Sequence, residues 1–347
     1  MISPLYESVP PRFYGGTERV VSFLTEELVR MGHDVTLFAS ADSVTSARLV
    51  PMAPESLRLS GSRDPLAHHV AMVHDVVESA SAFDILHFNI DYIHFAAVRT
   101  GGLDTVTTLH GRLDLPDLAP VYRRYPDMPL VSISDAQRAP LPWAAWTATV
   151  LHGLPPALLP EGAGRGGYLA FLGRISPEKR PDRAIRIARS IGMPLKIAAK
   201  IEGADRVYFE REIEPILGPG VEFIGEIGEA EKASFLGDAA ALLFPIDWPE
   251  PFGLVMIESM ACGTPVVAFR NGSVPEIVED GLTGWIVASE EEAVQALEAL
   301  DGFDRGACRR RFEERFSAHR MAADYVEVYR RILARSDLAR VPLRASA

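Results

Sequence analysis

Residues 244–287, FPIDWPEPFGLVMIESMACGTPVVAFRNGSVPEIVEDGLTGWIV, decide the fold of this chain. The apolar run from Ala240 to Phe244 predicts a strand, and three prolines force the next residues into a loop, because proline lacks an amide donor and has a fixed φ. Leu254 to Cys262 predicts a helix that ends at Gly263, and Thr264 to Phe269 predicts a second buried strand. The stretch is therefore predicted to be a strand, loop, helix, strand unit.

Two glutamates of this unit flank the predicted start of its helix. Glu250 lies in the loop and Glu258 one turn inside the helix, so both can face the first helical turn. The amides of Phe252, Gly253 and Leu254 lie between them and form an anion site suited to a phosphate. The carboxylates would repel the phosphate and are expected to accept hydrogen bonds from neutral hydroxyls on either side of it. A phosphate with hydroxyls on both sides describes a nucleotide sugar. The structural alternative is a pair of solvated surface glutamates.

The same residues resemble a known family. The run from Glu250 to Glu258 resembles the Glu-x7-Glu signature of the family 4 retaining glycosyltransferases, and Gly272 to Val287 resembles the segment that follows it in those enzymes. The resemblance implies an α/β protein of the GT-B fold, in which two doubly wound Rossmann-like domains face each other across a cleft and a C-terminal helix crosses back to the first domain. It also implies that Glu250 binds sugar hydroxyls and Glu258 binds the ribose.

Composition agrees with a two-domain enzyme. A chain of 347 residues exceeds what one hydrophobic core usually serves, and 48% hydrophobic with 24% charged residues is typical of a globular protein. The N-terminal residues lack a signal peptide pattern, and the only cysteines are Cys262 and Cys308, so we expect a cytoplasmic protein. The net charge of -12 argues against a nucleic-acid partner, and no apolar run is long enough for an integral membrane segment.

The first domain is predicted over residues 1–152, with alternating strands and helices that imply a parallel sheet covered on both faces. Ile2 and Ser3 read as the end of a strand, and family members usually start with a longer one. Thr17 is predicted to cap a helix that runs to Met31. Further strands are predicted at 35–39, 84–88, 105–109, 130–134 and 148–151.

Two features of this domain are candidates for the donor site. Tyr14, Gly15 and Gly16 precede the first helix, and the resemblance implies that the glycine pair approaches the phosphates of the donor. His110 follows a strand, where ligands of such sheets bind, and the resemblance implies that it faces the donor sugar. A turn and a structural histidine are the alternatives. Arg112 and Asp114 are candidates for the acceptor side by position only.

A linker is predicted over residues 153–167, which are rich in proline and glycine. Gly162 to Gly167 matches the dinucleotide-binding fingerprint formally, but it precedes a strand at Tyr168 to Leu172, whereas the fingerprint follows one. A dehydrogenase is thereby disfavoured. The second, nucleotide-sugar-binding domain is predicted over residues 168–316. A helix capped by Ser317, over 317–336, is expected to cross back.

Two cations follow the first strand of the second domain. Arg174 can bind a diphosphate as a planar fork and Lys179 as a movable point charge, although a solvated loop is the alternative. The resemblance implies that they are the diphosphate-binding pair of the family. The family often has glycine after this lysine, whereas this chain has Arg180.

The predicted reaction needs no metal and no cofactor. The sequence contains no Asp-x-Asp, and its histidines show no metal-ligand spacing. We therefore expect a metal-independent hexosyltransferase with a nucleoside-diphosphate sugar as co-substrate, a uridine-diphosphate hexose ahead of guanosine-diphosphate mannose. The acceptor, a sugar, lipid-linked glycan or small molecule, is not identified. The alternatives are an epimerase or phosphorylase on the same fold, the latter lacking a lysine context for pyridoxal phosphate, and a catalytically silent nucleotide-sugar binding module.

Overall fold

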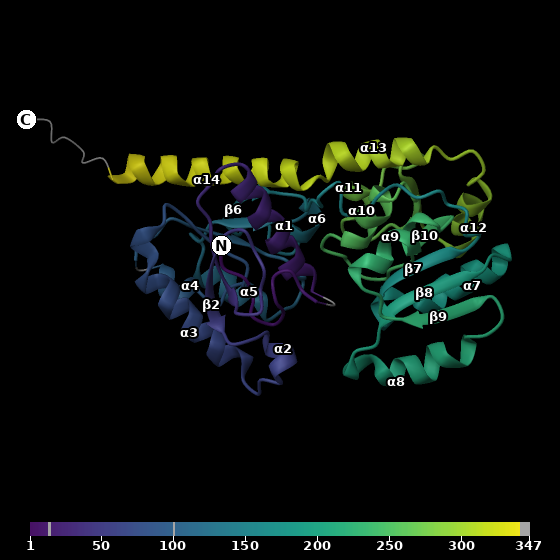
Figure 1. The fold of residues 1–347 in the computed structure, drawn as a ribbon, viewed down its shortest axis with the longest axis horizontal. Coiled ribbons are helices and arrows are strands. Elements are labelled where there is room, and N and C mark those ends of the chain that lie inside the picture. Colours follow the sequence, from purple (N-terminus) through teal and green to yellow (C-terminus); the bar gives the residue numbers. More distant parts are fainter. Residues whose placement is uncertain (13–14, 100, 341–347) are drawn as a thin grey trace, which may run out of the picture. The chain divides into compact units, whose positions relative to one another are not determined.

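The computed structural model describes residues 1–12, 15–99 and 101–340 and divides the chain into two units (Figure 1). The first unit contains Met1–Ile133, Arg138–Leu151 and the chain from Ala318 on, and the second contains Ser134–Gln137 and His152–Ser317. Tyr14, named above with the glycine pair, lies outside the described residues. Each unit is built on a parallel β-sheet and is described by itself.

The sheet of the first unit is joined through the N-terminal residues. Ile2 forms parallel bridges with Phe38 on one side and with Phe88 on the other, so the expected strand end lies between two longer strands. Around it the order is β2-β1, then β3-β4-β5-β6, all parallel. The strands are β1 Thr36–Ser40, β2 Arg48–Ala53, β3 Leu86–Phe88, β4 Thr105–Thr108, β5 Leu130–Ser132 and β6 Trp146–Thr149.

Helices cover this sheet. The apolar core combines the strands with residues of α3, α4 and α5, among them Met72, Phe95 and Tyr122. Helix α14 contributes Tyr325 and Tyr329, whose hydroxyls bond to Thr108 and His87 at 2.9 and 2.7 Å. The helices of the unit are α1 Gly16–Arg30, α2 Leu57–Ser60, α3 Pro65–Glu78, η1 Ala80–Ala82, α4 Phe95–Val98, α5 Leu118–Arg124 and α14 Ala318–Arg340, while α6 Asp135–Arg138 ends in it.

Three sequence-based details of this unit differ from the structure. The predicted cap at Thr17 is wrong, because α1 begins at Gly16 with Gly15 in the N-cap position and no side-chain cap. Strand β2 was not predicted, since its burial pattern is mostly half-exposed and it contains Pro51, which disfavours a strand assignment. The last helix extends beyond the predicted end at residue 336 to Arg340.

The second unit has a six-stranded parallel sheet in the order β12-β11-β10-β7-β8-β9. Strand β7 pairs with β8 on one side and with β10 on the other, so the direction of winding reverses between β7 and β10. Ligands of open α/β sheets bind at the carboxyl ends of the strands at such a reversal. The strands are β7 Leu169–Arg174, β8 Leu195–Lys200, β9 Val221–Gly225, β10 Ala241–Phe244, β11 Val266–Phe269 and β12 Gly284–Val287.

The helices of the second unit lie on both faces of its sheet (Figure 1). Residues 206–216 form three short helical pieces instead of one regular helix, since Pro215 cannot continue a regular helix. The helices are η2 Pro177–Lys179, α7 Pro181–Ile191, η3 Gly203–Asp205, α8 Arg206–Tyr208, η4 Phe209–Ile213, η5 Glu214–Ile216, α9 Glu229–Gly237, α10 Leu254–Ala261, α11 Val274–Ile277, α12 Glu290–Glu298 and α13 Arg305–Arg315.

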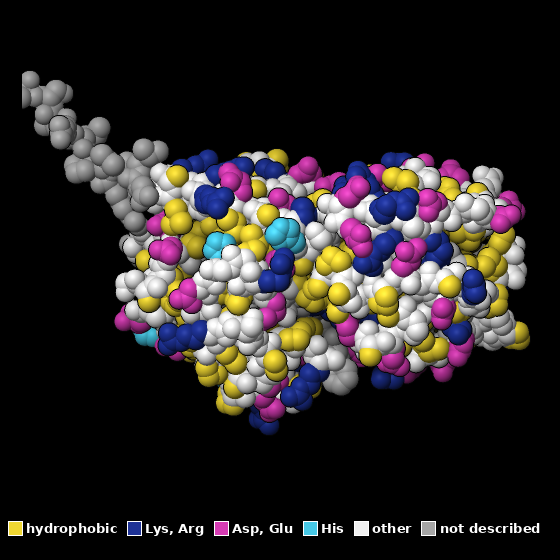
Figure 2. Space-filling view, turned by 45° about the horizontal axis from the view of Figure 1, so that its top comes forward, with side chains coloured by type: hydrophobic (Ala, Val, Ile, Leu, Met, Phe, Trp, Pro, Cys, Tyr) yellow, Lys and Arg dark blue, Asp and Glu magenta, His cyan; other side chains and the backbone are white. Residues whose placement is uncertain are grey.

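The surface shows charges of both signs. On the face drawn in Figure 2, the Lys and Arg side chains are interspersed with Asp and Glu side chains. Helix α13 illustrates this pattern, since Arg309 pairs with Glu313 and Arg311 pairs with Glu314. None of the helices in the described part of the chain combines the length and the apolar character needed to cross a bilayer.

Candidate functional site

The predicted residues of the second unit meet at the winding reversal of its sheet. Strand β7 ends at Arg174 and leads through η2 to Lys179, and β10 ends at Phe244 and leads into the loop that carries Glu250. Because β7 and β10 are neighbours, both loops leave the sheet at the same edge. The structure therefore brings Lys179 and Glu250 into direct contact.

Lys179 and Glu250 form an ion pair inside this site. The Lys179 ammonium bonds to Glu250 Oε2, and the two side chains are 17% and 11% exposed. Trp248 Nε1 donates to the same oxygen at 3.0 Å, and the ammonium lies 5.0 Å from the centroid of the Trp248 ring and 5.6 Å from that of Phe244. Trp248 was not identified from the sequence, since a single loop tryptophan gives no signal of its partner.

The N-terminus of α10 has the expected glycine geometry. Gly253 holds the N-cap position with φ of +80°, a left-handed conformation that favours glycine. A Cβ there would lie 2.7 Å from Met256 Cε and 3.2 Å from Phe244 Cζ. Phe252 before it is buried, and Leu254 is the first residue of the helix. The amides of these three residues stay our predicted phosphate donors.

A second glycine holds the Glu250 loop in place. Gly272 has φ of +53°, and a Cβ there would lie 2.3 Å from the Glu250 carbonyl oxygen and 2.4 Å from its nitrogen. Ser273 N donates to the Glu250 carbonyl at 3.0 Å, and Ser273 Oγ donates to the Phe252 carbonyl at 2.8 Å. The turn around Gly272 therefore fixes the backbone that carries Glu250.

We expect Gly272→Ala to lower the catalytic efficiency by about 10²-fold, the order that follows from misplacing a site group by about 1 Å. Gly281→Ala is the matched control, because Gly281 also has positive φ, +76°, but no atom lies within 4 Å of its Cβ position. The control should lose only about 1–2 kcal/mol of stability. Steady-state kinetics and thermal unfolding of both variants test this, and equal kinetic losses in the two would contradict it.

Glu258 lies on the buried side of α10 and is neutralised by a lysine that the sequence did not reveal. Lys232 Nζ of α9 donates to Glu258 Oε1 at 2.8 Å, and the side chains are 8% and 4% exposed. Lys232 lies within a run that reads as an ordinary amphipathic helix, and nothing in the spacing indicates a partner on α10. The buried position excludes the interpretation of Glu258 as a solvated surface residue.

Arg174 is surrounded by carboxylates. Its guanidinium pairs with Glu178, and it lies 3.5 Å from Glu202 Oε2 and 3.6 Å from Asp205 Oδ2. Burial, together with the neighbouring Glu178 and Glu202, raises the pKa of Asp205. A diphosphate that binds Arg174 must therefore compete with at least one carboxylate for the guanidinium.

The residue after Lys179 explains the preference of the family for glycine at this position. Arg180 has φ of +52°, which is uncommon for a residue with a Cβ. Its guanidinium pairs with Asp182 and Asp247, both at 2.9 Å, and these contacts offset the backbone strain.

His110 of the first unit lies at the carboxyl end of β4 and is oriented by an asparagine. Its Nε2 is 2.9 Å from Asn89 Oδ1, while Asn89 Nδ2 donates to the Ile2 carbonyl at 3.2 Å. Because the carbonyl can only accept, the Asn89 oxygen faces the ring, and Nε2 of the neutral imidazole carries the proton. Burial lowers the pKa of His110 to about 3. At neutral pH the ring is uncharged, with a lone pair on Nδ1.

Buried neutral histidines should make the first unit sensitive to acid. Burial lowers the pKa of His94 to about 3 and lowers that of His87 well below its ordinary value. Between pH 6.5 and 3 the unfolded chain binds protons that the folded chain does not, so stability falls as the pH falls, by up to about 1.4 kcal/mol per pH unit for each group. Burial raises the pKa of Glu18 to about 7. Between pH 4.5 and 7 the folded chain therefore binds a proton that the unfolded chain does not, and this contribution to stability rises as the pH falls.

We expect His94→Gln to reduce the pH dependence of the free energy of unfolding in acid, by the amount that corresponds to about one proton taken up on unfolding. Glutamine can keep a hydrogen bond like the one at 2.9 Å between His94 Nε2 and Thr107 Oγ1, but it does not titrate. Urea unfolding of wild type and variant between pH 6.5 and 4 measures the difference. An unchanged slope would show that His94 is not buried in its neutral form.

Gly15 and Gly16 lie at the start of α1, the place that an anion site at a helix N-terminus needs. A Cβ at Gly15 would lie 2.8 Å from Pro11 Cβ and 3.2 Å from Glu18 Oε2, so the position is too crowded for a larger residue. Glu18 is buried in the first turn of α1. Its raised pKa means that its charge near the glycine pair is reduced at neutral pH, which lessens the repulsion of a phosphate there.

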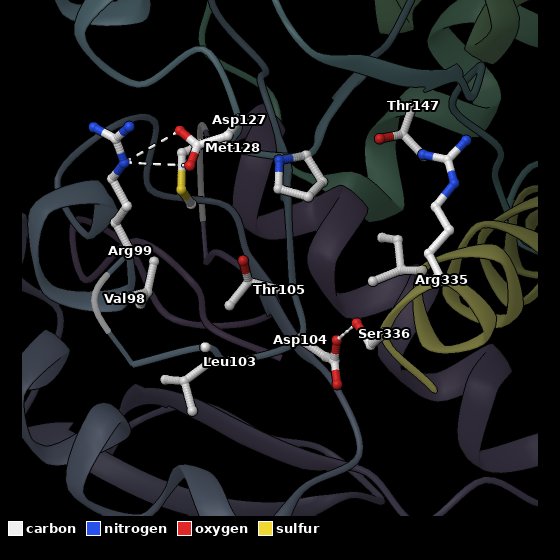
Figure 3. Close-up of a pocket in the computed structure, with 13 residues that line it drawn as sticks. Val98, Arg99, Leu103, Asp104, Thr105, Asp127, Met128, Thr147, Arg335 and Ser336 are labelled. Atoms are coloured by element: carbon white, nitrogen blue, oxygen red, sulfur yellow. Dashed lines mark hydrogen bonds and ion pairs between the residues drawn. The ribbon is translucent and has the colours of Figure 1, made fainter. Parts of the chain in front are cut away.

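Arg112 and Asp114 stay predicted candidates for the acceptor side. The two side chains pair with each other at 2.6 Å on the surface. Within the ranges that the structure describes, no group of three or more His, Cys, Asp or Glu side chains could hold a metal ion. A pocket of about 330 Å³ in the first unit is lined by residues such as Arg99, Asp127 and Ser336 (Figure 3). It lies near the amino ends of β4 and β5 and contains none of the predicted site residues.

Comparison with known families agrees with this geometry. Residues 14–152 match the family model described as Glycosyltransferase Family 4, and residues 163–304 match the one described as Glycosyl transferases group 1. This chain belongs to the family 4 glycosyltransferases. The resemblance drawn from the Glu250 to Glu258 motif is thereby confirmed.

Curated relatives of this family 4 glycosyltransferase match over part of their length. D-inositol 3-phosphate glycosyltransferase of Mycobacterium marinum is 34% identical over 151 residues, which cover 40% of this chain and 30% of that protein. An uncharacterized 41.2 kDa protein in the cps region of Klebsiella pneumoniae is 30% identical over 169 residues, covering 47% of this chain and 46% of that protein. The chain thus spans less than half the length of the curated relatives it matches.

Solved structures confirm the expected α/β class and GT-B fold. AviGT4, a glycosyltransferase involved in avilamycin A biosynthesis, is 26% identical with a TM-score of 0.72, and the match covers 94% of this family 4 chain and 93% of that one. Sucrose-phosphate synthase from Thermosynechococcus elongatus has a TM-score of 0.78 at 18% identity, covering 96% and 98%. Anabaena HepE, solved with UDP-glucose, has a TM-score of 0.72 at 17% identity, covering 94% and 98%.

Proposed function

We propose that this chain is a retaining, metal-independent glycosyltransferase that moves a hexose from a nucleoside-diphosphate sugar to an acceptor hydroxyl. A uridine-diphosphate hexose is the favoured donor, ahead of guanosine-diphosphate mannose. Two related structures support donor chemistry of this kind, since HepE was solved with UDP-glucose and AviGT4 is a glycosyltransferase. The acceptor is a sugar, a lipid-linked glycan or a small molecule.

The Lys179–Glu250 ion pair carries this proposal. It lies at the winding reversal of the sheet, where ligands of such sheets bind, and both side chains are mostly buried. A diphosphate that takes Lys179 as its counterion would leave Glu250 available to the hydroxyls of the attached sugar. One ion pair thus offers a cation for the phosphates and an acceptor for the sugar at adjacent positions.

The proposed reaction breaks the bond between sugar C1 and the β-phosphate oxygen, which keeps the electron pair. The acceptor oxygen bonds to C1 from the same face and passes its proton to the departing phosphate oxygen. Lys179, Arg174 and the N-terminal amides of α10 would stabilise the charge that develops on the diphosphate, with the Gly15 and Gly16 amides as further donors. His110, a neutral ring, would hydrogen-bond a sugar hydroxyl.

Binding of nucleotide sugars without added metal tests the proposal. Calorimetry and product release should show that wild type binds one donor of a panel in the presence of a chelator and hydrolyses it slowly. Glu258→Ala and Lys179→Ala should both weaken that binding. If no nucleotide sugar binds, the proposal is wrong. Interconversion of the donor into its epimer would establish the epimerase alternative. Binding of a donor without turnover with any acceptor would establish the silent binding module.

A further inference from the structure

Lys232 is the buried cation closest to the proposed ribose-binding carboxylate. Its ammonium donates to Glu258 Oε1 at 2.8 Å and lies 3.5 Å from Glu229 Oε2. The side chains of Lys232 and Glu258 are 8% and 4% exposed, whereas that of Glu229 is 35% exposed. Lysine is almost never fully buried unless it is paired, so the contact with Glu258 accounts for its position.

The helix that carries Lys232 is fixed to the end of α10. Thr264 Oγ1 donates to the Leu236 carbonyl at 2.7 Å, and Arg305 Nη2 donates to the Gly237 carbonyl at 2.9 Å. These two contacts, of which the Thr264 one is buried, hold the C-terminal end of α9 beside the turn that follows α10. The Lys232 ammonium is therefore held at a defined place against Glu258 before any ligand arrives.

We infer that Lys232 is a positioning residue for recognition of the donor ribose, acting through Glu258. This role rests on the proposed function. A carboxylate buried among apolar residues requires a cation to stay ionised. The ionised form is a pure acceptor at both oxygens and accepts more strongly than the protonated form, which suits two adjacent ribose hydroxyls that donate. Lys232 supplies that charge from the α9 side and leaves the ligand contacts to Glu258.

The readout is discrimination between ribose and deoxyribose, which a purely structural ion pair would not change. A hydrogen bond to a charged group contributes a factor of about 10–150 in affinity, so wild type should bind UDP or GDP tighter than its 2′-deoxy analogue by roughly that factor. Lys232→Met should reduce this preference to about threefold or less. Calorimetry with UDP, GDP and the two 2′-deoxy nucleotides measures all four affinities.

Three variants separate the roles. Lys232→Arg keeps the charge and should restore most of the ribose preference. Glu229→Gln removes the more exposed carboxylate beside Lys232 and should leave the preference at the wild-type value. The double variant Lys232→Met with Glu258→Gln should show the same preference as Glu258→Gln alone, because both changes act on one contact.

The outcomes distinguish this inference from the function on which it rests. If wild type prefers the ribonucleotide and Lys232→Met retains the full preference, Lys232 has no role in ribose recognition, although the donor site stands. If Lys232→Met lowers thermal stability but its ribose preference is unchanged, the ion pair only joins α9 to α10. If wild type binds neither UDP nor GDP, the proposed donor site and this role of Lys232 are both wrong.

Discussion

Replacement of Lys179 by methionine is expected to lower kcat by on the order of 10²–10³, the loss that follows removal of one preorganised group that stabilises developing charge. In the proposed reaction the departing diphosphate gains negative charge, and the Lys179 ammonium is mostly buried at the winding reversal, where its field is weakly screened. Methionine keeps most of the chain length, so packing against Phe244 and Trp248 should largely survive. Steady-state kinetics with saturating donor measures the effect.

Lys196→Met is the matched control. Lys196 belongs to the same sheet, and its ammonium also lies over an aromatic ring, 4.4 Å from the centroid of Tyr168, but it lies near the amino end of β8. Its replacement should leave kcat within about twofold, because it faces no part of the proposed site. A similar loss in both variants would show that the effect of Lys179 is general destabilisation.

Glu250→Gln should separate binding of the sugar from binding of the nucleotide. If Glu250 accepts hydrogen bonds from sugar hydroxyls, its neutralisation should lower the affinity for a nucleotide sugar by about 10–150-fold, as expected for hydrogen bonds to a charged group. The affinity for the free nucleoside diphosphate should stay equal or rise, because a carboxylate that competes for Lys179 is removed. Calorimetry with both ligands gives the two affinities.

Asp247→Asn is the control for this second prediction. Asp247 lies in the same loop, is 56% exposed and pairs with Arg180 rather than with Lys179. Its neutralisation should change neither affinity by more than about threefold. If Glu250→Gln lowered the affinity for the free nucleoside diphosphate as strongly as the affinity for the nucleotide sugar, Glu250 would not be a sugar-binding group.

The sequence predicted the strands and helices that carry the second unit's site, because hydrophobic runs and proline or glycine breaks mark them locally. It also predicted that Lys179 and Glu250 each lie in a loop that follows a strand of the second domain, where ligands of parallel sheets bind. The ion pair between them was not predicted. That contact depends on the pairing of β7 with β10, which no local pattern shows.

The partners of the candidate residues were missed for the same reason. Asn89 and His110 follow neighbouring strands, and Lys232 and Glu258 lie on two packed helices, so each pair is made by tertiary packing. Thr17 was predicted as a helix cap from residue type alone, whereas the helix begins one residue earlier at Gly16. Residue type indicates which chemistry is present, and packing decides which groups meet.

Helix α14 sets the order in which the first unit can be completed during synthesis. Its Tyr329 bonds to His87 across 242 residues, and its Tyr325 bonds to Thr108 across 217 residues. At about 5–20 residues per second, a ribosome would need roughly 10–50 s between the strand residues and the tyrosines. Until then the polar groups of His87 and Thr108 lack these partners. The second unit contains no residue after Ser317, so it can finish folding before the first.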